Sequence, residues 1–422
     1  MARFDRILRL SFALVLALTA AGARAEQHWV VDEASMPSLA KVWLEGSLAS
    51  RSEDGHAFAT VATDGKAHPA FVALRGLTPL RDGRTSFVKV VLRAHGMEHL
   101  ANLQVRIGSD SLAKSWYALP VPIFKDREYN FVQEGTWAAV TLSFGMADVT
   151  GAPDRGKLDS FGLMVTDDGT GPVEVDLAGL ALVDDPQAGV VSFTFDDGYK
   201  EHVEAARLMA QHGWRATAYV IPQVIGTHPA YMTLDGLAEL KRLGWDVAAH
   251  DDPPFTSIPP AELEPRLRGI QKFLTDHGYA DGAQHLAYPL GKQEPKRVRP
   301  TIARVFTTAR IAGGGPETFP PADPHLLRAV NVIAGTKPEE VAAWARRARD
   351  EREWLILMMH WLPEKTQKPT DYAMSDFRRM LDLVAETKVR VAPMTEVWRE
   401  AAPIVAAETM FPPASSPAKP AP

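Results

Sequence analysis

The spacing of hydrophobic residues changes about halfway along the 422-residue chain. Between about 26 and 186, short runs of alternating or β-branched residues are separated by Gly, Asp and Pro, as at 87–93, 103–107 and 137–143. No helical period is evident in this part. Several short strands at such spacing predict a β-sandwich.

From about 187 onward, apolar strands alternate with helical segments, the pattern of β-α units around a parallel sheet. The predicted strands are 190–195, 216–221, 246–249, 285–288, 305–309, 326–332, 354–359 and 389–392, and the predicted helices are 200–212, 234–243, 260–277, 295–304, 338–352 and 375–387. About seven such units favour a barrel over residues 187–402. The Ala/Pro-rich end, 403–422, is predicted to be a disordered tail.

The first 25 residues carry an export signal. Three arginines precede the apolar run Phe12 to Ala20, and Ala23-Arg24-Ala25 matches a small-x-small cleavage site. The run is too short to span a bilayer. We therefore expect a mature protein that begins at Glu26, has no transmembrane span and resides in the periplasm or outside the cell.

The amino-acid composition excludes several kinds of cross-link, metal site and nucleophile. The chain has no cysteine, so disulfides, thiolate metal ligands and a cysteine nucleophile are excluded. Its formal charge is −6 and no long basic run occurs, which argues against a nucleic-acid partner. A metal in this protein must bind to oxygen and nitrogen ligands.

Three predicted strands, far apart in sequence, end in carboxylates or imidazoles. These residues are Asp196 and Asp197 with Gly198, then His250, Asp251 and Asp252, and finally His360. The active site of a parallel barrel lies at the carboxyl ends of its strands, so these groups should meet at one rim. Because successive side chains of a strand alternate, Asp196 and Asp197 can hold different roles, one as a metal ligand with His250 and one as a base. An isolated Asp-Asp-Gly is also typical of a turn with a helix cap, but the matching histidines favour a site.

These motifs resemble those of the polysaccharide deacetylases, carbohydrate esterase family 4 or NodB-homology domains. The first motif is Thr194 to Gly198, Ala287-Tyr-Pro-Leu-Gly291 resembles the third, and Leu357-Met-Met-His360 resembles the last. Order and approximate spacing agree over 189–398. The runs at 158–166 and 173–182 also resemble the closing strands of a galactose-binding-like or carbohydrate-binding jelly roll.

The resemblance to the deacetylases implies a fold and a set of roles. The fold is a distorted (β/α)7 barrel, and the activity is hydrolysis of acetyl groups on a polysaccharide with a divalent metal. Asp196 would be the general base, His360 the general acid, and Asp197 and His250 metal ligands. The backbone N–H of Tyr199 would help to bind the oxyanion. Zinc is the expected metal, with cobalt or nickel as alternatives.

The second motif of the family, His-Ser/Thr-x-x-His, is altered here. Pro254 stands where the second histidine is expected, and the Phe-Thr-Ser-Ile run that follows indicates a loss of two residues. Three interpretations remain open. Asp252 or Asp251 replaces the imidazole, which we favour; a histidine from elsewhere, such as His228 or His202, joins the site; or metal binding is weakened and the domain binds without catalysis.

The remaining predicted site residues concern substrate contact. Tyr288 and Pro289 belong to the third motif, and Trp361, next to the expected acid, could wall an acetyl pocket. Ala287 occupies the place of the family's arginine, and Arg310, at the end of another strand, could orient Asp196 instead; a surface arginine is an equal alternative.

The expected substrate is therefore an acetylated polysaccharide, most simply an N-acetylhexosamine polymer of an exopolysaccharide or cell wall. Two alternatives are kept. One is an O-acetyl esterase of the xylan type, since an alkoxide leaves more easily than an amine nitrogen. The other is a non-catalytic polysaccharide-binding protein, whose glycan affinity Asp196→Asn would leave unchanged.

Overall fold

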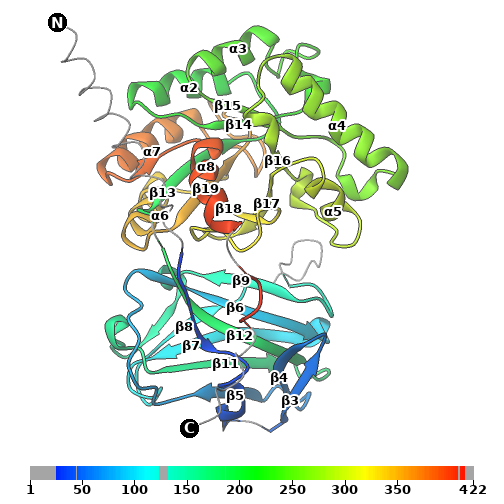
Figure 1. The fold of residues 1–422 in the computed structure, drawn as a ribbon. Helices are drawn as coiled ribbons and strands as arrows, with labels where there is room; N and C mark the ends of the chain where they lie inside the picture. Colours follow the sequence, from blue (N-terminus) through cyan, green and yellow to red (C-terminus); the bar gives the residue numbers. More distant parts are fainter. Residues whose placement is uncertain (1–24, 44, 123–131, 186, 407–408, 414–422) are drawn as a thin grey trace, which may run out of the picture.

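The computed structural model describes residues 25–43, 45–122, 132–185, 187–406 and 409–413 (Figure 1). The predicted signal segment lies almost entirely outside these residues. Within them, no helix combines the length and the apolar character needed to cross a membrane.

The first half of the described chain is built from antiparallel strands. These are β1 (Gln27–Val31), β2 (Ala40–Trp43), β3 (Ser47–Glu53), β4 (His56–Ala62), β5 (Pro69–Leu74), β6 (Ser86–His95), β7 (Leu100–Gly108), β8 (Trp116–Pro120), β9 (Ala138–Leu142), β10 (Asp148–Thr150), β11 (Ser160–Asp167) and β12 (Glu174–Asp184). The first sheet has the order β3-β4-β12-β6-β9 with β1 paired to β12, and the second sheet has the order β10-β8-β7-β11-β5-β2. The all-β prediction for this half is confirmed.

Alternation along the strands places one face of each sheet in a shared core. In β6, Val88, Val90 and Leu92 lie in the same apolar cluster as Val105 and Ile107 of β7 in the second sheet. The two sheets therefore pack face to face as a sandwich. The other face of β6 points away from this core.

The second half contains a parallel barrel. Its strands are β13 (Val190–Phe195), β14 (Thr217–Val220), β15 (Asp246–Ala249), β16 (His285–Ala287), β17 (Thr308–Gly314), β18 (Leu327–Asn331), β19 (Trp354–Met359) and β20 (Arg390–Val391). Its helices are α2 (His202–Gln211), α3 (Leu234–Arg242), α4 (Pro260–Asp276), α5 (Val298–Ala303), α6 (Pro338–Asp350), α7 (Met374–Glu386) and α8 (Met394–Val405). β13 pairs with β14 and with β19, which closes a ring of seven parallel strands, and β20 adds to β13.

Burial explains why these segments fold in this way. Every residue of β13 and of β19 is buried, as expected for strands that are covered on both sides. Around them, α7 buries Met374, Phe377 and Leu381 on one face. The predicted parallel barrel is confirmed, although residues 315–326 between β17 and β18 contain no helix.

The predicted disordered tail is wrong in part. α8 continues to Val405, because its apolar residues recur on one side and Val397, Ala401 and Ile404 are buried. Residues 409–413 then lie against the sandwich. Residues 407–408 and 414–422 lie outside the described part of the chain.

The sandwich is joined to the barrel by buried polar contacts. The Ser143 hydroxyl donates to a Glu353 carboxylate oxygen at 2.7 Å, and the Arg328 guanidinium donates to the Thr141 carbonyl at 2.7 Å while it pairs with Glu317. Arg328 and Glu353 lie near the amino ends of β18 and β19. The sandwich therefore contacts the barrel near the amino ends of these strands, and it lies on one side of the barrel (Figure 1).

Candidate active site

Asp196 and Arg310 form a buried ion pair at the carboxyl end of the barrel. Asp196 follows β13, and Arg310 comes from β17 across the ring. Nη2 of Arg310 donates to both Asp196 oxygens, at 2.5 and 2.6 Å, and the two side chains are 4% and 1% exposed. The guanidinium fixes the orientation of the carboxylate. Of the two alternatives for Arg310, the structure therefore shows the contact with Asp196 and not the surface arginine.

The next carboxylate, Asp197, points to a different partner. Its Oδ1 lies 3.4 Å from Nε2 of His250, which follows β15. Asp197 has a φ of 73°, in the left-handed region that non-glycine residues seldom adopt, and Gly198 follows with a φ of 88°. This sharp turn lets two consecutive aspartates serve separate partners.

His250 is oriented by the third motif. Its Nδ1–H donates a hydrogen bond to the carbonyl oxygen of Ala287 at 2.8 Å. Nε2 faces Asp197: in the protonated ring it donates to the carboxylate, and in the neutral ring it carries the lone pair that a metal can bind. A histidine held through one nitrogen while the other faces a carboxylate is the usual arrangement of a metal-binding imidazole.

The charges of this pair support each other. Burial alone would raise the pKa of Asp197, but the hydrogen bond to His250 and the nearby imidazoles outweigh it, and the pKa lies below its usual range. Burial alone would lower the pKa of His250, but Asp197 and Asp196 outweigh it and raise the pKa. The carboxylate is therefore ionised at neutral pH and available to a cation.

His360 completes the rim from the end of β19. Its Nε2 lies 4.0 Å from Oδ2 of Asp196. Behind it, the buried His202 donates from Nε2 to the His360 carbonyl at 2.8 Å. Burial lowers the pKa of His202 to about 4, so this ring is neutral. His202 therefore supports the backbone of His360 and is not a ligand in this structure.

The favoured third metal ligand is not found. Asp251 is fully buried and turned away from the rim, with its oxygens 2.5 and 2.8 Å from Nε and Nη2 of Arg266 on α4. Asp252 is exposed, and neither aspartate has a ligand atom grouped with those of Asp197 and His250 in the described residues. The prediction of Asp251 or Asp252 as ligand is wrong for this structure, because Arg266 holds the segment outward. His228 is exposed on its loop and accepts a hydrogen bond from its neighbour Ala230.

The third motif contributes differently from what we expected. Tyr288 is 2% exposed, and its hydroxyl donates to the His325 carbonyl at 3.1 Å. Pro289 is also buried. The prediction that these two side chains contact substrate is therefore wrong, because they pack inside the barrel. Leu290 between Pro289 and Gly291 is instead 64% exposed and offers an apolar contact that the sequence reasoning missed.

Tyr199 and Trp361 belong to a row of aromatic rings beside the site. The Tyr199 ring stacks on Trp361 at 6.1 Å and on Tyr231 at 5.1 Å. Tyr231 was missed because it comes from the loop before α3, which pairs with the chain at Tyr199 only in the folded protein. In the described residues, the backbone N–H of Tyr199 has no acceptor, so it remains available to an oxyanion.

The Asp197–His250 pair fits one edge of a metal site. Two ligands that each lie about 2.0–2.1 Å from a tetrahedral ion are about 3.3–3.4 Å apart, as the facing atoms of this pair are. The pair provides an oxygen and a nitrogen ligand, which suits zinc and other divalent ions. Among the described residues, no third Asp, Glu or His ligand atom is grouped with this pair. Elsewhere in the described residues, three side chains are close enough together to bind a metal ion: Glu26, His28 and Asp184. They lie in the sandwich and not in this site.

The family comparison agrees with this geometry. Residues 184–304 match the family described as polysaccharide deacetylase. Residues 184–304, the first part of the barrel, therefore belong to the polysaccharide deacetylase family. The family expected from the motifs is confirmed, and with it the enzyme class, a hydrolase of carbon–nitrogen bonds in acetylated carbohydrates. The matched segment includes Asp196, Asp197 and His250. It ends before Arg310 and His360, which the folded barrel brings to the same rim.

Solved structures similar to the deacetylase domain share little sequence with it. They include the carbohydrate esterase domain of a xylanase from the hindgut metagenome of Trinervitermes trinervoides, with 14% identity, 51% of this chain and 91% of that chain covered, and a TM-score of 0.36. The family 4 carbohydrate esterase of Streptomyces lividans has 15% identity, coverage of 48% and 91%, and a TM-score of 0.34. The chitin deacetylase of Colletotrichum lindemuthianum has 14% identity, coverage of 50% and 88%, and a TM-score of 0.35. No curated protein matches the chain.

Proposed function

We propose that this protein is an exported, metal-dependent deacetylase that removes N-acetyl groups from a hexosamine-containing polysaccharide. The observation that carries the proposal is the meeting of two pairs at one rim. Asp196 lies 4.0 Å from His360, and Asp197 lies 3.4 Å from His250. One pair can move protons while the other binds a cation.

In this mechanism Asp196 and His360 perform the proton transfers. Asp196, oriented by Arg310, accepts a proton from the water that attacks the acetyl carbon. Protonated His360 donates from Nε2 to the amine nitrogen as the carbon–nitrogen bond breaks, which leaves acetate and a free amine. The N–H of Tyr199 donates to the oxygen that becomes negative during the attack.

Asp197 and His250 would hold the metal. When bound, a divalent ion polarises the acetyl carbonyl as a Lewis acid. Asp197 offers Oδ1 and His250 offers Nε2, the atom left free by the bond from Nδ1 to Ala287. Zinc is the expected ion, and cobalt or nickel also suits such a site.

One observation favours a second function, polysaccharide binding without turnover. In the described part of the chain, no third Asp, Glu or His is grouped with Asp197 and His250, and Asp251 is engaged by Arg266. Fewer ligands weaken metal affinity. In the proposed deacetylase, Asp197 and His250 would therefore have to hold the metal without an aspartate of the altered motif.

Acetate release separates these functions. The mature protein, supplied with zinc, cobalt or nickel, is incubated with chitooligosaccharides and with acetylated xylan. We expect acetate from chitooligosaccharides, and a loss of about 10²- to 10⁴-fold in kcat for Asp196→Asn, the range of a general base. Release from xylan alone selects the O-acetyl esterase. Binding without release in either case selects the non-catalytic function.

The location and the sandwich are part of the proposal. The arginines and apolar run before Ala25 support export, with cleavage before Glu26. The barrel would be a distorted (β/α)7 barrel in the sense of the family, since one crossover lacks a helix. The sandwich would be a carbohydrate-binding jelly roll. Amino-terminal sequencing of the periplasmic protein tests the cleavage site.

A further inference from the structure

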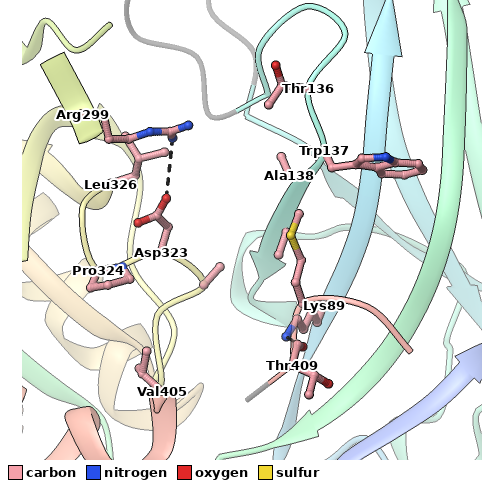
Figure 2. Close-up of a pocket in the computed structure, with 13 residues that line it drawn as sticks. Lys89, Thr136, Trp137, Ala138, Arg299, Asp323, Pro324, Leu326, Val405 and Thr409 are labelled. Atoms are coloured by element: carbon pink, nitrogen blue, oxygen red, sulfur yellow. Dashed lines mark hydrogen bonds and ion pairs between the residues drawn. The ribbon is translucent and has the colours of Figure 1, made fainter. Parts of the chain in front are cut away.

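A cleft separates the sandwich from one wall of the barrel. Figure 2 shows Arg299 and Asp323 on the barrel wall, Lys89 and Trp137 on the sandwich wall, and Thr409 of the C-terminal segment at its edge. The C-terminal segment, residues 409–413, comes after α8 in the sequence and lies against the first sheet. The cleft opens onto the face of this sheet that points away from the sandwich core.

That face carries an aromatic surface. Phe58 and Trp137 meet edge to face at 5.4 Å, and the Arg93 guanidinium lies over both rings, at 5.3 and 4.6 Å. Asp176 and Glu53 hold Arg93 through ion pairs at 2.8 and 2.6 Å. We call this set, together with His56, the aromatic face.

The C-terminal segment occupies the aromatic face. The Phe411 ring stacks on His56 at 4.0 Å with an interplanar angle of 14° and meets Trp137 edge to face at 5.5 Å. The Thr409 carbonyl accepts a hydrogen bond from Nζ of Lys89 at 2.8 Å. The segment thus presents one flat ring to the aromatic side chains and one oxygen to a lysine.

The aromatic face does not depend on this segment for its own polar contacts. The ion pairs of Arg93 and the 2.6 Å hydrogen bond from Thr60 to Asp176 are formed within the sandwich alone. The polar groups of the aromatic face are thus already hydrogen-bonded or ion-paired. The half-buried rings of His56 and Trp137 can therefore stack on a ligand that replaces the C-terminal segment. A sugar ring has the required properties, an apolar C–H face and hydroxyl oxygens at its edge.

We propose that the aromatic face and the adjoining cleft bind a polysaccharide strand, and that the C-terminal segment is a displaceable cover. A pyranose ring takes the place of Phe411 against His56 and Trp137, and a sugar oxygen takes the place of the Thr409 carbonyl at Lys89. The inference rests on the proposed function only for the polymer class. Binding at this surface requires no turnover at the barrel rim.

Calorimetric titration with the hexamer of N-acetylglucosamine tests the proposal. The full mature chain carries Asp196→Asn in every variant, so that hydrolysis does not interfere. Phe411→Ala uncovers the surface, and Pro413→Ala, in the same segment but exposed, is the matched control. Trp137→Ala and His56→Ala remove the stacking partners, and circular dichroism with thermal unfolding checks the fold of each variant.

We expect Phe411→Ala to raise the affinity of one binding site about three- to tenfold, the value of an aromatic contact, while Pro413→Ala has no effect. Trp137→Ala and His56→Ala should remove that site and leave binding at the barrel rim. Unchanged binding in folded Phe411→Ala and Trp137→Ala variants overturns the proposal and makes the segment a strap between the two halves. Absence of hexamer binding in all variants overturns it as well.

Discussion

Two strands of the barrel end in nearly the same sequence and build opposite structures. β13 ends in Asp196-Asp197-Gly198, and β15 ends in His250 followed by Asp251-Asp252-Pro253. Each pair supplies one fully buried aspartate that is held by an arginine. Asp196 meets Arg310 from inside the ring, whereas Asp251 meets Arg266 from α4 outside it.

The second aspartate of each pair accounts for the rest of the difference. Asp197 adopts a left-handed φ of 73° and turns back toward His250. Asp252 precedes a proline, which favours extended backbone, and its side chain is exposed. Two adjacent carboxylates at a strand end therefore become a site only where the turn and the arginine direct both inward.

The largest expected effect comes from removing the inner arginine. Arg310→Met leaves the Asp196 carboxylate buried without a counter-charge. We expect a loss of about 3–5 kcal/mol in the free energy of unfolding, the cost of breaking a buried pair. Because Asp196 also loses its orientation, kcat should fall at least about 100-fold. Denaturant unfolding and acetate release measure the two effects, and Arg310→Lys should recover part of both.

Removing the outer arginine should separate stability from activity. Asp251 is buried but Arg266 is 33% exposed, so this pair lies closer to solvent than the Asp196–Arg310 pair, in which both side chains are buried. We expect a smaller loss of about 1–3 kcal/mol and a kcat within about threefold of wild type for the remaining folded protein. A collapse of kcat in this variant would show that the second motif takes part in catalysis.

A buried histidine lies near each of these two strand ends, and both histidines make the stability of the fold depend on pH. His202 adjoins His360, and His285 is in β16, next to β15; burial lowers the pKa of each to about 4. Unfolding lets each ring bind a proton below its ordinary pKa of about 6.5, so stability is full above that value. It should fall by up to about 1.4 kcal/mol per pH unit for each ring as pH drops toward 4.

Urea unfolding at pH 7, 6 and 5 measures this slope, and His285→Gln should flatten it by one proton. Asp185 opposes the trend, because burial raises its pKa to about 8 and it favours the folded state more as pH falls. Asp185→Asn should therefore steepen the acid loss. An unchanged slope in His285→Gln would mean that this ring is not neutral in the fold.

The smallest expected effect belongs to the outer, exposed aspartate. Asp252→Asn removes a charge in solvent that has no side-chain partner among the described contacts. We expect a change of less than about 0.5 kcal/mol in stability and a kcat close to that of wild type. Acetate release under saturating substrate is the measurement. A large loss would mean that the segment moves inward when substrate binds.

Local pattern predicted most of the barrel, because apolar strands and one-sided helices can be read from neighbouring residues. It also placed Asp196, Asp197, His250 and His360 at one rim. It failed for the end of α8, where Pro403 and the Ala/Pro-rich sequence after it masked an amphipathic helix, and for Asp251, whose partner Arg266 lies on the following helix. Tyr231 was missed for the same reason, since a folded loop brings it to Tyr199. The positions of Asp251 and Tyr231 depend on partners from other elements, which the sequence of a strand end does not show.

Metal content tests the central claim most directly, that the cation site belongs to Asp197 and His250 and needs no ligand from the altered motif. Mature protein, Asp197→Asn and Asp252→Asn are equilibrated with zinc, freed of excess metal and analysed for bound ions. The account predicts about one ion per chain in wild type and Asp252→Asn, and almost none in Asp197→Asn. Loss of the ion in Asp252→Asn, or its absence from the wild-type protein, would contradict it.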